Sequence, residues 1–250
     1  MLRRVVTFVG TSIVASVLVF GVTSLLPSSP AQIILGTQGT PQQVAALNAR
    51  LGLDRPLVEQ YLHWMSGLLT WHLGTSYVSQ IDISTQLSEA LSVTVPLVLL
   101  GLVFALVVGI SFGVVGARHE RRAGGIIASA LSQLGLSVPS FALGLLLISI
   151  FGVRFHLLPA GGFTAWSTSP FGALRSLILP GVALGVVEAA IIAKYTRVAV
   201  GEVLRSRYYQ SAIANGASPR RALWRHGPRN VAISLLTVVS LELVGLLVGA

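Results

Sequence analysis

Long apolar stretches alternate with shorter polar ones along the chain, and the apolar stretches have the length of membrane spans. A helix needs about 20 apolar residues to cross a hydrocarbon core about 30 Å thick. Five stretches reach or approach that length, at residues 5–26, 93–116, 126–153, 177–193 and 231–250. The pattern predicts an all-α, polytopic membrane helical bundle that forms one transmembrane domain over residues 1–250.

Three of these spans have features of their own. The third contains Pro139, which removes a backbone donor and clashes with the preceding turn, so we expect a kink there. The fourth is the shortest and carries Glu188. The first follows two arginines, as a signal peptide does, but its apolar run of 22 residues exceeds the roughly 7–15 of a signal sequence, which favours a retained helix.

Composition excludes several classes of protein. Of the 250 residues 53% are hydrophobic and 10% charged, against about 25% charged in a soluble domain. Without cysteine there are no disulfides or thiolate zinc sites. The five histidines are scattered with none at i, i+4 spacing, so no metal site is predicted. Lys194 is the only lysine and no glycine-rich loop precedes it, which excludes a P-loop for ATP hydrolysis.

The basic excess indicates topology. The formal charge is +9, and with the N-terminus inside, 13 of the 17 basic residues fall in the three inner segments. The outer segments hold four basic and four acidic residues. Positive charge marks the cytoplasmic side of a membrane protein. We therefore expect a cytoplasmic N-terminus and no nucleic-acid partner.

The outer segment, residues 27–92, carries helix signals. Thr40 and Gln43 are spaced as a capping box with proline at the first helical position, and Gly52 ends that helix. Pro56 starts a second helix with an apolar stripe. The stripe packs on the membrane surface or on other helices, and the segment is also a candidate platform for an external partner.

The inner segment, residues 194–230, is rich in arginine and centred on Gly216. A glycine there is typical of a helix C-terminus, and Ser218 with Pro219 is typical of the start of another short helix over 220–226. The pattern fits a projecting helix–glycine–helix element that transmits force from a soluble partner. A basic hairpin resting on anionic lipid is the alternative.

The run from Ser211 to Leu223, Ser-Ala-Ile-Ala-Asn-Gly-Ala-Ser-Pro-Arg-Arg-Ala-Leu, followed by Arg225-His226 and Arg229-Asn230, resembles the EAA loop of ABC-importer permeases. It is most similar to the dipeptide/oligopeptide/nickel branch, in its first-permease, dipeptide permease B-like form. Further matching runs, in the same order along nearly the whole chain, are Leu51–Pro56, Leu73–Ser76, Gly135–Phe141, Leu158-Pro159 and Thr196-Arg197.

The chain departs from the family pattern at three positions. Gln210 stands where the general pattern has an acidic residue, Asn215 where this branch often has a basic one, and Pro228 is unexpected. Family members also continue into a further outer loop and a sixth span, in a type I-like transmembrane domain.

The resemblance implies a set of partners. It implies a bacterial inner-membrane permease subunit that pairs with a second permease, two cytoplasmic ATPases that hold ATP and Mg, an external solute-binding protein and membrane lipid. The chain itself would hold no cofactor and catalyse no reaction. Coupling helices over residues 208–226 would contact one ATPase, through Tyr208, Gln210, Ser211, Ala212, Asn215, Gly216, Ser218, Pro219, Arg220, Arg221, Arg225 and His226.

Two glutamates in spans, Glu188 and Glu242, are a separate inference from the residues. A carboxylate in a bilayer is costly and usually faces a cavity or a partner group. Together with Pro139, they are candidates for the translocation path, where one would contact the amino end of a peptide. The alternative is a hydrogen-bonded role between helices.

Import of nickel chelates, import of glutathione and ion-driven secondary transport stay open as alternative functions. Nickel-chelate and glutathione importers share these motifs. A secondary transporter driven by an ion gradient would use Glu188 and Glu242 as proton sites. A membrane enzyme is disfavoured, because no histidine lies centrally in a span.

Overall fold

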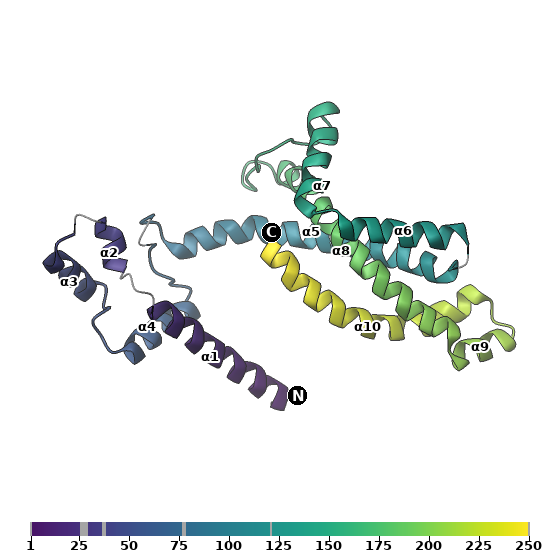
Figure 1. Cartoon of the computed structure of the whole chain (residues 1–250), viewed down its shortest axis with the longest axis horizontal. Coiled ribbons are helices and arrows are strands. Elements are labelled where there is room, and N and C mark those ends of the chain that lie inside the picture. Colours follow the sequence, from purple (N-terminus) through teal and green to yellow (C-terminus); the bar gives the residue numbers. More distant parts are fainter. Residues whose placement is uncertain (1, 26–29, 37–38, 77–78, 121, 250) are drawn as a thin grey trace. The chain divides into compact units, whose positions relative to one another are not determined.

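The computed structural model describes residues 2–25, 30–36, 39–76, 79–120 and 122–249. Within these ranges all regular structure is helical, apart from one isolated bridge between Thr75 and Asp82. The predicted all-α class is confirmed (Figure 1). The chain divides into two compact units, residues 1–90 and 91–250.

In its described residues the first unit contains the helices α1 (Leu2–Ser24), α2 (Pro30–Leu35), α3 (Pro41–Arg50) and α4 (Leu57–Leu69), and the start of α5 (Ile83–Arg118). Helix α4 packs on α1 through aromatic rings. The Phe20 ring lies 5.5 Å from that of Tyr61 and 5.9 Å from that of Trp64. The Tyr61 hydroxyl lies 2.8 Å from Ser16 Oγ, so part of the predicted apolar stripe is covered by the first span helix.

The helix signals of the outer segment are confirmed. Thr40 and Gln43 form the reciprocal capping box at the start of α3. Gly52 follows that helix with a φ of 70°, a left-handed conformation that favours glycine. At the start of α5, the Asp82 carboxylate accepts a hydrogen bond of 2.9 Å from the Thr85 amide, which lowers the pKa of Asp82.

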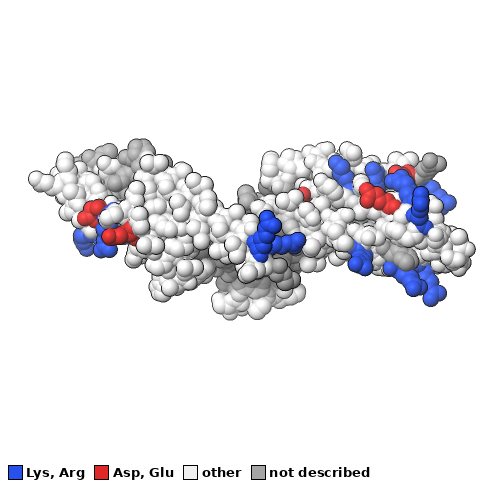
Figure 2. All heavy atoms as spheres, turned by 90° about the horizontal axis from the view of Figure 1, so that it is seen from below, with Lys and Arg blue, Asp and Glu red and all other residues white. Residues whose placement is uncertain are grey.

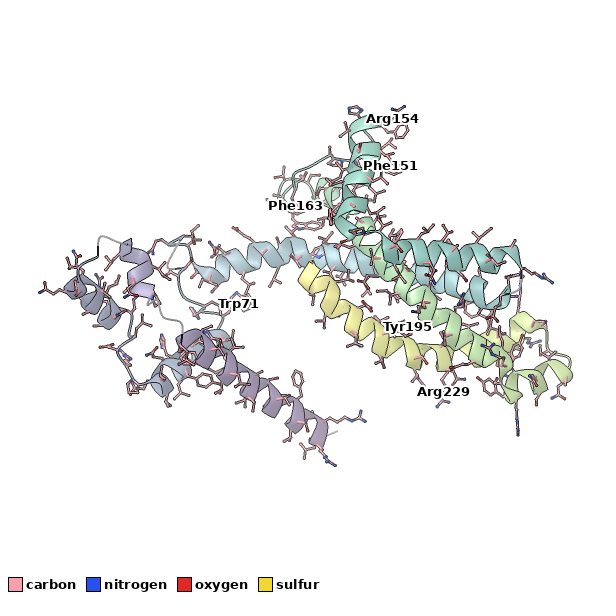
Figure 3. All side chains as sticks on the ribbon, in the orientation of Figure 1. Trp71, Phe151, Arg154, Phe163, Tyr195 and Arg229 are labelled. Carbon is pink, nitrogen blue, oxygen red and sulfur yellow. The ribbon has the colours of Figure 1, made fainter. Side chains whose placement is uncertain are left out.

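The second unit is built around α8. It contains the rest of α5, then α6 (Ala123–Ser137), α7 (Ser140–Leu147) running into the π-helical η2 (Ile148–Arg154), α8 (Pro170–Arg205), α9 (Arg207–Ala214) and α10 (Pro219–Gly249). Helices α6, α7 and α10 pack against α8. Between η2 and α8 a loop packs the ring of Phe163 on Trp166, with centroids 6.1 Å apart (Figure 3).

Small residues let α5 approach α8 closely. A Cβ on Gly109 would lie 2.8 Å from the Ala189 carbonyl oxygen, and one on Gly113 would lie 2.5 Å from Thr196 Cβ. These two glycines, four residues apart, share one face of α5, as do Gly101 and Ala105. Helices in membranes associate through such small-residue faces, because lipid offers no hydrophobic drive for association.

The third predicted span is broken at Pro139. Helices Ala123–Ser137 and Ser140–Arg154 meet at an angle of 101°, which is far more than the kink we expect from a proline inside one continuous helix. The preceding residue, Val138, is extended with ψ at 122°. A proline disfavours helical geometry in the residue before it, so the helix ends there and a new one begins.

Other helices run beyond the predicted spans. Helix α5 starts at Ile83, well before residue 93, and α8 continues from the fourth span through Arg205. The prediction of a separate short helix over 220–226 is wrong. Those residues are the first turns of α10, which continues through Pro228. Among the described residues, four helices are long and apolar enough to cross a membrane, or up to five if the bent pair counts as one span.

Candidate functional site

A short helix, α9, projects between the two long helices α8 and α10 (Figure 1). One residue, Ser206, separates α8 from α9. Its hydroxyl donates to the Val203 carbonyl at 2.6 Å and accepts from the Tyr209 amide at 3.4 Å. The same side chain therefore closes one helix and caps the next, so the two helices are joined by a short and defined turn.

The exit from α9 is a Schellman motif at Gly216. The Ala217 amide donates to the Ala212 carbonyl at 3.0 Å, and the Gly216 amide donates to the Ile213 carbonyl at 2.9 Å. Gly216 has a φ of 86°, which confirms the predicted glycine at the helix end. The cap at Ser218 is confirmed too, since its hydroxyl accepts from the Arg221 amide at 3.4 Å.

Two tyrosines hold α9 on the bundle. Tyr209 packs against a buried cluster formed by α5, α8 and α10, whose members are Ala117, Val200, Val203 and Leu223. Tyr208 accepts a hydrogen bond of 2.9 Å from the Asn230 side chain of α10. Helix α9 therefore contacts residues of three long helices, α5, α8 and α10.

The outward side of this element carries small, polar and basic residues. Four predicted coupling residues on and after α9, Gln210, Ser211, Asn215 and Gly216, are exposed, while Ala212 is half-buried. Exposed residues also begin α10, namely Pro219, Arg220, Arg221 and Arg225. Figure 2 shows basic side chains gathered over this end of the unit, and Arg229 extends from α10 there (Figure 3). His226 lies on α10, with its side chain outside the described part.

Glu188 and Glu242 come together across the α8–α10 interface. Glu188 is 9% exposed, and its Oε2 atom has no hydrogen-bond partner among the described residues. The Glu188 carboxyl faces that of half-buried Glu242, close enough for the two groups to interact. The structure thus pairs two carboxyls that stand 54 positions apart in the sequence.

The residues that flank Pro139 pack on a different face of α8, while Pro139 itself is exposed. On either side of it, Gly135 of α6 approaches Ala190, and Gly144 of α7 approaches Ala183. Ala183 and Ala190 share a helix face that points away from Glu188, given 100° per residue. The three predicted pathway residues therefore do not form one cluster.

Sequence reasoning missed a cavity between α5, α6 and α8. Its volume is about 70 Å³, and its lining includes Ser129, Ser132, Gln133, Lys194 and Arg197. The sequence held a signal for this cavity. Lys194 and Arg197 stand three residues apart at the end of the fourth predicted span, and Ser129 and Ser132 lie in the third. Among the described residues, no group of three or more His, Asp or Glu side chains is placed to hold a metal ion.

Comparison with known families decides what kind of protein carries this element. Residues 109–250 match the model of the binding-protein-dependent transport system inner membrane component, and residues 1–98 match the model of its N-terminal part. The chain belongs to this family. It is accordingly a multi-pass inner-membrane protein and a component of a transport system.

Relatives in this family are permeases. The chain is 35% identical over 251 aligned positions, covering 99% of it and 79% of the relative, to a probable peptide ABC transporter permease of Sinorhizobium fredii. It is 32% identical, over 100% of it and 79% of the relative, to glutathione transport system permeases of Escherichia coli and Salmonella typhi. The predicted family and branch are confirmed.

Proposed function

We propose that this chain is the membrane-spanning permease subunit of an ATP-driven importer for small peptides. The observation that carries the proposal is the capped α9 element, anchored to three long helices, in a chain that belongs to a binding-protein-dependent transport family. Its peptide permease relative supports di- or oligopeptides as the substrate class. Glutathione, itself a small peptide, is the second candidate, favoured by the glutathione permease relatives.

The proposed partners follow from the transport family to which the chain belongs. ATP and Mg belong to two cytoplasmic ATPase subunits, and this chain catalyses no reaction. A second related permease completes the pathway, and an external binding protein delivers the substrate. The exposed residues of 208–226 contact one ATPase.

Coupling in this scheme is a difference in contact energy between two global states. ATP-dependent closure of the ATPases moves α9, and Tyr209 passes the movement to the helices beneath it. A partner shifts such an equilibrium only by as much as its contacts differ between the two states. Because short, hydrogen-bonded turns join both ends of α9 to α8 and α10, a movement of α9 changes the positions of the membrane helices.

Reconstitution of the complete complex in liposomes tests this function. With binding protein outside and ATP with Mg at the ATPases, labelled dipeptide and labelled glutathione are offered separately. We expect uptake of at least one substrate that stops when ATP or the ATPase subunits are left out. Uptake driven by an ion gradient without the ATPases would overturn the proposal and favour a secondary transporter.

We infer further that Glu188 and Glu242 line the translocation path and hold the ammonium group of a peptide. Two facing carboxyls in an apolar region repel when both are charged, and a cation between them relieves the repulsion. A primary ammonium supplies that cation. The unpartnered Oε2 of Glu188 supports this inference.

Replacing Glu242 with glutamine tests the pathway role. Hydrogen bonds to charged groups contribute about 1.5–3 kcal/mol, so we expect KM for a peptide with a free amino end to rise about tenfold or more. An N-acetylated peptide should be transported as before, and Glu202→Gln, an exposed position on α8, is the matched control. Unchanged transport with unchanged assembly would remove Glu242 from the path.

A further inference from the structure

The cavity between α5, α6 and α8 has the chemistry of an anion site. Lys194 and Arg197 contribute two positive charges to its lining, and within the described residues no carboxylate lines it. The one ion pair seen in the described part of this unit joins Arg205 to Glu120 at 3.9 Å, outside the cavity. Within the described part of the chain, the two charges in the cavity therefore have no carboxylate counterion beside them.

Arg197 is held in place with most of its donors unused. Its guanidinium donates to Ser129 Oγ, while the Ser129 hydroxyl donates to the Gly125 carbonyl at 2.8 Å. The serine thus acts as an acceptor that orients the arginine. A guanidinium has five N–H donors in a planar fork, and among the described residues Arg197 donates only to Ser129. The other donors are suited to a tetrahedral oxyanion.

The cavity also has room and an apolar border. Its volume is about 70 Å³, which exceeds the roughly 10–15 Å³ required by one water molecule. Phe112 and Leu136 line it and are 39% and 42% exposed, so apolar surface continues outward from the charged lining. An anion that carries an apolar chain would contact both the charged lining and this apolar border.

The location matches a headgroup position. The cavity lies near the C-terminal ends of α5 and α8, at the end of the unit where basic residues gather (Figure 2). Basic pockets between membrane helices on the cytoplasmic side bind anionic lipid headgroups. We propose that Lys194 and Arg197, with the Gln133 amide, bind a phosphate group, supplied by an anionic phospholipid or by a free phosphate.

The test uses the full chain purified in detergent and counts bound ligand by native mass spectrometry. The probes are phosphatidylglycerol, phosphatidylcholine and inorganic phosphate, each added separately. We expect the native chain to retain phosphatidylglycerol well above phosphatidylcholine. Retention of inorganic phosphate with no preference for phosphatidylglycerol would support the site and identify free phosphate as its source.

Variants that remove the charge of Lys194 or Arg197 measure how much each residue contributes to binding of the phosphate group. Each basic residue contributes about 1 kcal/mol to the binding of an anionic headgroup, which is about fivefold in affinity. We therefore expect Lys194→Gln to weaken retention of the bound probe about fivefold and the double variant with Arg197→Gln about thirtyfold. Arg118→Gln is the matched control, because Arg118 is exposed at the same end and does not line the cavity. An equal loss in that control would overturn the proposal, as would unchanged retention in the double variant.

A filling variant keeps the test decisive if Arg197→Gln does not fold. Ser132→Phe leaves both charges and occupies the half-buried lining. We expect it to abolish retention of the bound probe while the chain still elutes as a folded species. Retention at the native level would show that the anion binds elsewhere. Since the readout is ligand bound and not transport, failure here leaves the proposed import function standing.

Discussion

Replacing Gly216 with valine is expected to release the ATPase from the assembled complex and to reduce ATP-driven uptake at least tenfold. Gly216 has a φ of 86°, and a residue with a Cβ pays about 1–2 kcal/mol there, with β-branched residues worst. Apart from its chain neighbours, no atom of the described residues lies within 4 Å of a Cβ at this position, so the effect is one of backbone conformation. Without the left-handed turn the Schellman hydrogen bonds fail, and α10 leaves α9 in another direction.

Co-purification of the permease with its ATPase measures this effect. Gly162→Val is the matched control, because Gly162 has a φ of 77° and open space around it but lies outside the coupling element. Gly216→Asn should keep the ATPase, since asparagine tolerates the left-handed region. Stoichiometric ATPase bound to the Gly216→Val variant would refute the assignment of 208–226 as the coupling element.

Replacing Gly113 with alanine is expected to destabilise the bundle by about 1–3 kcal/mol, the usual cost of overpacking a well-packed interface. The added Cβ would lie 2.5 Å from Thr196 Cβ and 2.7 Å from the Ala193 carbonyl oxygen. Thr196 is fully buried, so neither atom has space to move, and α5 must separate from α8.

Unfolding of the chain in detergent, followed by temperature, measures the loss. Gly10→Ala is the matched control, since outside its own helix backbone no described atom lies within 4 Å of a Cβ at Gly10 on α1. There the lower backbone entropy of alanine should leave the midpoint unchanged or slightly higher. A Gly113 variant that unfolds at the same temperature as Gly10→Ala would show that the close approach of α5 and α8 contributes no stability.

Local chemistry is what the sequence could predict well. The capping box at Thr40, the glycine at 216 and the serine cap at 218 were all readable, because each depends on a few neighbouring residues. Hydropathy located the apolar core of each span for a similar reason. It did not locate helix ends, because the stretch of α8 from Lys194 to Arg205 contains no proline, and its single glycine, Gly201, does not end the helix.

The pairing of helices, and the residues that it brings together, depend on long-range packing. The sequence by itself determined that this chain is a helical membrane protein with a capped basic element on one side, since length, polarity and caps are local properties. Only the tertiary structure showed that α8 lies at the centre of its unit, that Glu188 meets Glu242, and that Lys194 and Arg197 share a cavity with hydroxyls of α6. Such pairings depend on which helix faces meet, and small residues far apart in the sequence set those faces through the distance at which backbones can approach.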